Sequence, residues 1–502
     1  MQAYPRDPPH HPPKRVSELP DSLLSSIFLR CSPSDAVERT LSRVCQRWRN
    51  VALDLPALWT RIVLDCPAAH QEDVLQTYLQ RAIGTTRNSP PLPLELYIEG
   101  RDSTPWTRLI RIIHAHKPLW RAISIRVLSG VLSFTDAAAQ FTHLDLPLIE
   151  HLSIIFHIYP QDDEKEILME SPVIIFAGST HVKTLRLQGT GAAYLQLAKQ
   201  NVTTLHLKES AFRVRECPDL HILLQFFPSL VHLSLLGDFV RIGLPQPRRI
   251  IDTPNLRSLR VSDSTTLSTL LLSLSAPGLE FLTLRNFTCA QLQLFRERYE
   301  PWSDSPNADR FPKLRTLVLI RPEVSKDELR RLFSDFASIT RLDLINCFSD
   351  DALEVLAEKN PDLGRVGLST LLPLPYLEIL SVHHLRNVEQ ALGQFVSPRA
   401  EAGGSIPKLR LHANIPRSEV FSLLHENIIW RWDKLDSWPL SDVSASEYRV
   451  FEDEHDLGMQ MLTKPPNERN LMLNLRAPQR EDESPNWWQK LGKWLKRFIG
   501  FS

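Results

Sequence analysis

The sequence predicts a mixed α/β protein. A small N-terminal helical hairpin is followed by a long, irregular solenoid of strand–turn–helix units, and the chain ends in an amphipathic helix. Three observations lead to this prediction. The 502 residues include 80 leucines, and a six-residue leucine pattern recurs through the middle of the chain. Proline outnumbers glycine, 38 to 17, which favours short apolar segments separated by turns.

Composition narrows the function classes. The 58 Lys and Arg residues balance 58 Asp and Glu residues, so net charge gives no reason to expect nucleic acid as a partner. The low glycine content argues against phosphate-binding loops. Six scattered cysteines without a Cys-x-x-Cys pair fit free thiols in a reducing compartment. We therefore expect a cytoplasmic or nuclear protein, or one found in both.

The N-terminal region divides into a lead and a helical hairpin. Residues 1–15 hold five prolines and no apolar run, which predicts a disordered lead rather than a signal peptide. Residues 16–62 are predicted to form two amphipathic helices around a polar break at 32–35. Apolar positions are 19, 23, 24, 27 and 28 in the first helix, and 37, 41, 44, 45, 48, 51, 52 and 55 in the second. So small a hairpin must pack on the rest of the chain or on a partner.

Three submotifs follow one another in this hairpin. They are Leu19-Pro20-x-x-Leu23-Leu24-x-x-Ile27-Phe28, Val44-Cys45-x-x-Trp48-Arg49 and Leu55-Pro56-x-Leu58-Trp59. This ordered set resembles an F-box, particularly the form expanded in mushroom-forming fungi. The resemblance implies docking on the Skp-type adaptor of a cullin–RING ubiquitin ligase. It assigns the adaptor contact to Leu19, Pro20, Leu23, Ile27, Val44, Cys45 and Trp48. Leu24, Phe28, Val51 and Leu55 fit the hairpin core equally well, and Trp48 fits both roles.

Nine segments between residues 149 and 382 share the pattern apolar-x-x-Leu-x-apolar. Their central leucines are 152, 185, 205, 233, 259, 282, 317, 342 and 380. The Leu-x-Leu half has a period of two, which predicts a strand with one buried face and one outward face. A proline often precedes the unit (Pro228, Pro254, Pro277, Pro312, Pro375 and Pro407), and helix-compatible stretches lie at 289–300, 326–337 and 349–360. The array resembles leucine-rich repeats, and we place this solenoid at residues 63–427.

The outward positions of these strands form a candidate target-binding surface. They mix polar side chains with single aromatic ones, which suits a protein ligand. The candidate residues are Arg186, His206, His232, Arg260, Phe281, Arg341 and Asp343.

No catalytic or metal site is predicted. Gly189-Thr190-Gly191 lacks the rest of a phosphate loop, and no GxSxG or HExxH motif occurs. No cysteine lies at zinc-finger spacing from the histidine pairs at 10–11, 114–116 and 383–384. Cys45, set among apolar residues, is interpreted as a small buried hydrophobe. We therefore expect no enzyme activity, cofactor or metal.

The C-terminal region changes character. We interpret residues 428–485 as a capping and linker region and residues 486–502 as a cationic amphipathic helix. Its apolar and cationic residues include Trp487, Trp488, Leu491, Trp494, Phe498, Lys493, Lys496 and Arg497. The helix either caps the open end of the solenoid or contacts a membrane or partner.

The sequence as a whole favours the substrate-recognition subunit of an SCF-type (Skp–cullin–F-box) ubiquitin ligase. The hairpin would bind the adaptor, and through it a cullin, and the solenoid would bind a target protein. The alternative is a scaffold outside any ligase, whose hairpin caps the solenoid and whose C-terminal helix associates with a membrane.

Overall fold

The computed structural model describes most of residues 19–432. Within that range it leaves out several short stretches and the longer ones 31–36, 84–91, 128–137, 157–172, 189–194, 209–223, 238–250, 293–310, 359–372, 384–391, 400–406 and 413–427. The chain divides into two units, Met1–Phe451 and Glu452–Ser502, and all described residues belong to the first. The predicted lead, nearly all of the capping and linker region, and the C-terminal helix lie outside the described residues.

The N-terminal helical block has more helices than the predicted hairpin. It consists of α1 (Asp21–Arg30), α2 (Val37–Leu41), α3 (Gln46–Leu53) and the 3-10 helix η3 (Pro56–Trp59). The predicted second helix is wrong as a continuous element, because the backbone at Cys45 is extended (φ −160°, ψ 170°). The Cys45 sulfur accepts a hydrogen bond from the Trp48 backbone N–H (3.5 Å) and so caps α3. The apolar spacing runs through this break, so spacing alone did not reveal it.

The nine predicted repeat strands are confirmed. They lie in a parallel sheet that has 14 strands among the described residues, in the order β1-β2-β3-β4-β6-β8-β9-β11-β13-β14-β15-β16-β17-β18. The predicted nine are β4 (His151–Phe156), β6 (Thr184–Gln188), β8 (Thr204–Lys208), β9 (His232–Leu236), β11 (Ser258–Ser262), β13 (Phe281–Arg285), β14 (Thr316–Ile320), β15 (Arg341–Ile345) and β16 (Ile379–His383).

The register stacks each central leucine on the next. Leu152 pairs with Leu185, and the match continues strand by strand to Leu342 and Leu380. These leucines belong to one hydrophobic core that also includes the leucine two residues further along most strands. A shift of one residue would move every leucine to the other face, so the pattern fixes the register.

A proline-containing turn precedes many of the strands. In these turns the fourth residue donates its backbone N–H to the first carbonyl, as Leu279 does to Ala276 (3.0 Å) and Leu314 does to Phe311 (3.0 Å). Pro277 and Pro312 therefore occupy the second turn position, where a φ near −65° is required. The recurring proline of the sequence pattern is thus a turn residue that aims the chain into the next strand.

Five strands extend the sheet beyond the nine predicted units. They are β1 (Arg61–Leu64), β2 (Leu94–Gly100), β3 (Trp120–Val127), β17 (Lys408–His412) and β18 (Ile428–Trp432). The sheet therefore begins at Arg61, inside the predicted hairpin range, and continues past residue 427. Two small parallel pairs lie outside it: β5 (Val173–Ile175) with β7 (Leu195–Leu197), and β10 (Ile251–Asp252) with β12 (Leu274–Ser275).

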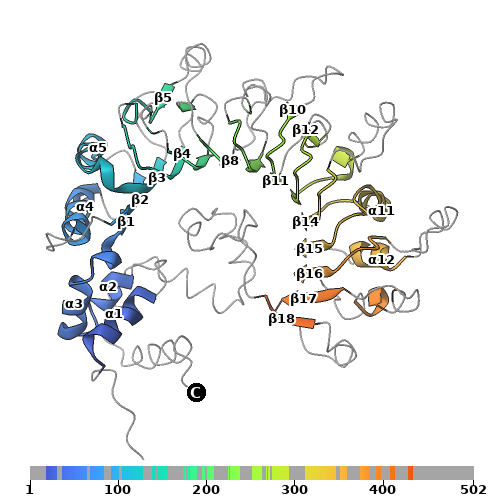
Figure 1. The fold of residues 1–502 in the computed structure, drawn as a ribbon, viewed down its shortest axis with the longest axis horizontal. Helices are drawn as coiled ribbons and strands as arrows, with labels where there is room; N and C mark the ends of the chain where they lie inside the picture. The colour runs from blue at the N-terminus through green and yellow to red at the C-terminus, as the bar shows by residue number, and fades with distance from the viewer. Residues whose placement is uncertain are drawn as a thin grey trace, which may run out of the picture. The chain divides into compact units, whose positions relative to one another are not determined.

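Helices between the strands lie on one and the same side of the sheet (Figure 1). They are α4 (Ala68–Ile83), α5 (Trp106–Ala115) with the 3-10 helix η4 (Lys117–Leu119), α11 (Lys326–Asp335) and α12 (Asp351–Ala357). The last two confirm helix predictions at 326–337 and 349–360. No helix among the described residues is long and apolar enough to span a bilayer.

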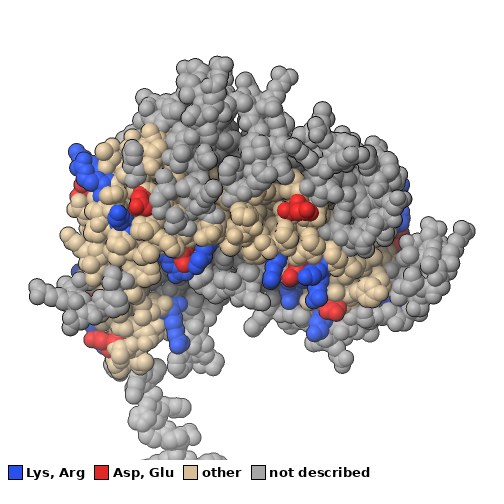
Figure 2. Space-filling model, turned by 45° about the horizontal axis from the view of Figure 1, so that its top comes forward, with Lys and Arg blue, Asp and Glu red and all other residues tan. Residues whose placement is uncertain are grey.

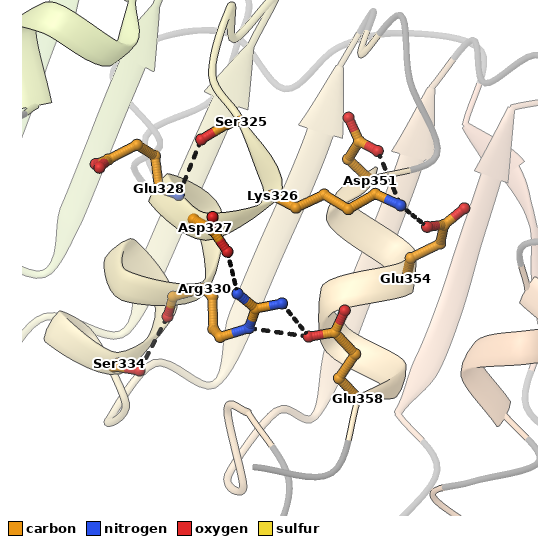
Figure 3. Close-up of polar contacts among 9 residues, drawn as sticks. All are labelled: Ser325, Lys326, Asp327, Glu328, Arg330, Ser334, Asp351, Glu354 and Glu358. Carbon is orange, nitrogen blue, oxygen red and sulfur yellow. Dashed lines mark hydrogen bonds and ion pairs between the residues drawn. The ribbon is translucent and has the colours of Figure 1, made fainter. Parts of the chain in front are cut away.

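Neighbouring helices α11 and α12 are joined by ion pairs (Figure 3). Arg330 donates to the Glu358 carboxylate (Nε 2.9 Å, Nη2 2.6 Å), and Lys326 contacts both Asp351 (3.4 Å) and Glu354. Ser325 caps α11 by accepting a hydrogen bond from a backbone N–H in the first turn. These charges are partly exposed, so solvent screens the ion pairs and they contribute little to the free energy of unfolding.

Candidate adaptor-docking surface and repeat face

The seven predicted adaptor-contact residues fall into two groups. Pro20, Leu23 and Cys45 are exposed, and Leu19, Ile27 and Val44 are partly exposed. Leu23 is 50% exposed, which is unusual for a leucine in a small helical block. The structure therefore presents six of the seven at the surface of α1 and of the turn before α3. We call these six residues the docking surface.

Arg47 holds the two parts of the docking surface together. Its Nε donates to an Asp21 carboxylate oxygen (2.9 Å), and its Nη2 donates to the same carboxylate (2.6 Å) and to the Leu19 carbonyl. Asp21 opens α1 and Arg47 lies in the first turn of α3. The start of α1, with Leu19 and Pro20, therefore lies beside the Val44–Cys45 turn.

Trp48 differs from the other six predicted contacts. It is only 7% exposed, and its ring centroid lies 5.0 Å from that of Phe28. Its neighbours in the block core are Leu24, Phe28, Leu41, Val51 and Ala52. The structure thus places Trp48 in the core, one of the two roles that the sequence allowed. Cys45 is the reverse: the interpretation as a buried hydrophobe is wrong, because this residue is exposed and its sulfur caps α3.

Comparison with known proteins supports the N-terminal assignment. The family described as F-box-like matches residues 16–65. The chain carries an F-box-like domain at its N-terminus. A 50-residue segment is 48% identical to the "Putative F-box/LRR-repeat protein 22" of Arabidopsis thaliana, covering 10% of this chain and 16% of that protein. This relative comes from a plant, and the fungal resemblance stays a prediction.

A solved structure from Bacteroides fragilis is also similar in part. It covers 59% of this chain and 66% of its own, at 15% identity and a TM-score of 0.26. So low a score supports no conclusion about either fold or function.

The predicted target-binding residues lie on strands β6, β8, β9, β11, β13 and β15 of the large sheet. Arg186, His206, Arg260 and Asp343 occupy the middle position of their strands, and His232, Phe281 and Arg341 occupy the first position. The four middle residues are nevertheless buried, at 2–8% exposure, although the pattern predicted outward positions. Each middle residue lies between its equivalents on adjacent strands, about 4.8 Å away. Long side chains therefore shield the short side chains beside them from solvent, as His206 and Arg260 do on either side of Ser234.

Some polar residues of this face were missed by the sequence pattern. Lys208 and Arg285 occupy the last position of their strands, two residues after the middle one. The six-residue motif ends one residue earlier, so it does not include them. The negative charge of Asp343, by contrast, is balanced within its own strand, because Arg341 donates hydrogen bonds to both carboxylate oxygens of Asp343 (3.0 and 2.6 Å).

Charged residues elsewhere form mixed groups. Glu150 accepts from Lys183 (2.7 Å) and from Arg121 (3.0 Å), and these contacts, that of Lys183 first, hold the pKa of its carboxyl below the usual range. Figure 2 shows Lys and Arg beside Asp and Glu in several such groups. The described residues on that face therefore form no extended field of one sign, the feature that nucleic-acid binding needs. No group of His, Cys, Asp and Glu among the described residues could hold a metal ion.

His232 gives the repeat face a pH dependence. Burial, followed by the charge of Arg257, lowers the pKa of His232 from 6.5 to about 4. Its register neighbours Thr204 and Ser258 are uncharged. As the pH falls, His232 takes up a proton in the unfolded chain before it does so in the folded protein. Its contribution to the free energy of unfolding is therefore fully present above about pH 6.5 and falls by about 1–3 kcal/mol toward pH 4.

Urea unfolding at pH 7 and pH 4.5 measures this effect. Wild type is expected to lose more stability than His232→Gln between the two values, because the variant lacks the titrating ring. Carboxylates titrate in both proteins and cancel in the comparison. Equal losses would contradict the assignment to His232.

Proposed function

We propose that this chain is the substrate-recognition subunit of an SCF-type ubiquitin ligase. The F-box-like domain binds a Skp-type adaptor, and through it a cullin, and the repeat sheet binds a target protein. The chain itself contributes no reacting group. It accelerates ubiquitin transfer by holding a target lysine near the ubiquitin-carrying enzyme. A protein with this role works in the cytoplasm, the nucleus or both.

The observation that carries the proposal is the exposed apolar side of the F-box-like domain. Pro20 and Leu23 lie at the surface beside Ile27 and Val44, while Leu24 and Phe28 of the same helix are buried. Neighbouring apolar side chains that together form an exposed patch are typical of a protein–protein interface. The match of residues 16–65 to the F-box-like family supports a Skp-type adaptor as the partner.

A scaffold in which this domain only caps the sheet explains the structure less well. A cap at this end buries its apolar residues against the first strand of the sheet and presents a polar outer face. Here α1 keeps Leu23 half exposed, on the side that is not used for the block core. Adaptor binding gives this side chain a role that capping does not.

Leu23→Asp tests the proposal, and Leu29→Asp is its matched control. Both leucines are on α1 with similar exposure, 50% and 52%, but six residues separate them by about 120° around the helix. Leu23→Asp is expected to weaken adaptor binding about 30-fold or more, because a central interface residue contributes about 2 kcal/mol or more.

Calorimetric titration of the full-length chain with purified Skp-type adaptor measures both variants. Leu29→Asp should bind like wild type, and circular dichroism should show all three proteins equally folded. If Leu23→Asp binds as tightly as wild type, the docking surface has been placed wrongly. If wild type itself does not bind, the proposed function is wrong.

A further inference from the structure

The end of the F-box-like domain is built like a repeat unit. Residues 59–64 and 120–125 share the pattern Trp-x-x-Ile-x-(Leu or Ile), and each follows a helix and a short 3-10 helix that contains proline. Trp59 and Trp120 are both buried. The indole N–H of Trp59 donates to the Ala52 carbonyl (2.9 Å), and that of Trp120 donates to the Ile113 carbonyl (2.8 Å), in each case seven residues back. The segment α3–η3–β1 thus repeats the construction of α5–η4–β3.

The two hydrophobic cores meet at this segment. Leu58 packs against the core of the helical block and also against the core of the sheet. The Trp59 ring meets the Tyr78 ring edge-on, with centroids 5.2 Å apart, and the Arg81 guanidinium lies 4.2 Å from the Trp59 ring centroid. Helix α4, which carries both partners, is therefore packed directly on the last turn of the F-box-like domain.

A partly buried polar cluster forms a second link between the same parts. The Tyr78 hydroxyl of α4 donates to the Glu38 carboxylate of α2 (2.5 Å) and accepts from Arg39 Nε (3.0 Å). Arg39 also donates to the Val63 carbonyl on β1 (3.4 Å). Burial, followed by the bond to Glu38, raises the pKa of Tyr78 to about 12. The hydroxyl therefore keeps its proton and remains a donor at any physiological pH.

Helix α2 leads from this cluster to the docking surface. The Ser42 N–H donates to the Glu38 carbonyl and the Ser42 hydroxyl donates to the Arg39 carbonyl (3.0 Å each). The Val44 N–H then donates to the Leu41 carbonyl (3.3 Å), and Val44 directly precedes Cys45, the cap of α3. A continuous run of hydrogen bonds and packed side chains thus connects the exposed Val44–Cys45 turn to helix α4.

We propose that the Glu38–Tyr78–Arg39 cluster couples the docking surface to the first repeat, so that adaptor binding also stabilises helix α4 and strand β1. The inference rests on the proposed function, because its ligand is the Skp-type adaptor. Tyr78, Glu38 and Arg39 act here as positioning residues that do not touch the adaptor. Their role is to make the F-box-like domain and the first repeat unfold and refold locally as one unit. This coupling fixes the geometry between target and ligase.

Hydrogen exchange of the full-length chain, with and without purified Skp-type adaptor, tests the coupling. Tyr78→Phe removes only the hydroxyl and keeps the ring that packs on Trp59. Glu38→Gln is the second variant, because it keeps the size of the side chain. Thr77→Ala is the matched control: it removes a hydroxyl from the same helix, one that bonds only within α4, to the Asp73 carbonyl.

In wild type and in Thr77→Ala, the adaptor is expected to slow exchange in α4 by nearly the same factor as in α3. That factor approaches about 100-fold when the adaptor is present at 100 times its dissociation constant. In Tyr78→Phe and Glu38→Gln, protection of α1 and α3 should remain while protection of α4 falls to a few-fold or less.

The outcomes separate the two proposals. Protection of α1 without protection of α4 in wild type overturns the coupling and leaves the proposed function standing. Equal α4 protection in wild type and both cluster variants also overturns it. No protection anywhere, α1 included, overturns the proposed function and the coupling with it.

Discussion

Trp48→Ala is expected to destabilise the F-box-like domain by about 3–5 kcal/mol and to abolish adaptor binding. The reason is loss of packing rather than loss of a contact with the adaptor. Trp48 is one of six residues in the buried cluster of the block, and its ring packs on Phe28. A core this small cannot close around the cavity left by an indole.

Hydrogen exchange resolved along the chain measures this prediction. Exchange should become fast in α1 to α3 and stay slow in the central strands, whose leucines belong to the other core. Trp48→Phe is the control, because it keeps an aromatic ring beside Phe28 and should retain most of the adaptor binding. A Trp48→Ala protein with wild-type exchange and no adaptor binding would show that Trp48 is a contact residue after all.

Trp59→Ala is expected to cost about 3–5 kcal/mol as well, but its effect should reach both parts of the chain. Trp59 is 1% exposed, bonds to Ala52 of α3 and packs against Tyr78 and Arg81 of α4. Removing the indole therefore opens the contact between the F-box-like domain and the first repeat. Both α3 and α4 should lose protection from exchange.

Trp120→Ala is the matched control for this variant. Trp120 has the same burial and the same indole hydrogen bond, but it opens β3, two strands further along the sheet. It should destabilise the region around α5 and leave adaptor binding unchanged. If Trp59→Ala and Trp120→Ala affected adaptor binding equally, Trp59 would have no special place at the junction.

The repeat architecture could be predicted because its signal is both local and redundant. A leucine pair with a period of two fixes the strand and its buried face, and a proline two residues ahead fixes the turn. The leucine pair recurs nine times and the proline recurs in many of these units, and the register of the sheet follows from the leucine pairs. Helices 326–337 and 349–360 were predictable for the same reason, since their apolar spacing is helical.

The missed strands show where the pattern was too narrow. Strands β1 and β3 carry isoleucine at the central position, Ile62 and Ile123, and each pairs in register with Leu96 of β2. Their first apolar residue, tryptophan, satisfies the pattern, so the isoleucine in place of the central leucine is what excluded them. Strand β17 is different: Ile406, Leu409 and Leu411 satisfy the pattern, so this unit could have been found.

The position of the F-box-like domain could be predicted from the sequence, but the exposure of its side chains could not. The submotifs lie within the stretch that matches the F-box-like family. The sequence left Trp48 open between core and contact, and it wrongly placed Cys45 among the buried residues. Helical spacing cannot show that the chain becomes extended at Cys45, because that depends on the cap it forms for α3. The Glu38–Tyr78 bond could not be predicted either, since it joins residues 40 positions apart.

The central claim is that this chain is the F-box subunit of a ubiquitin ligase. Size-exclusion chromatography of the full-length chain mixed with a purified Skp-type adaptor and its cullin tests that claim most directly. The account predicts one complex containing all three proteins, which forms with Leu29→Asp and fails to form with Leu23→Asp. Separate elution of the folded wild-type chain from an intact adaptor–cullin complex would contradict it.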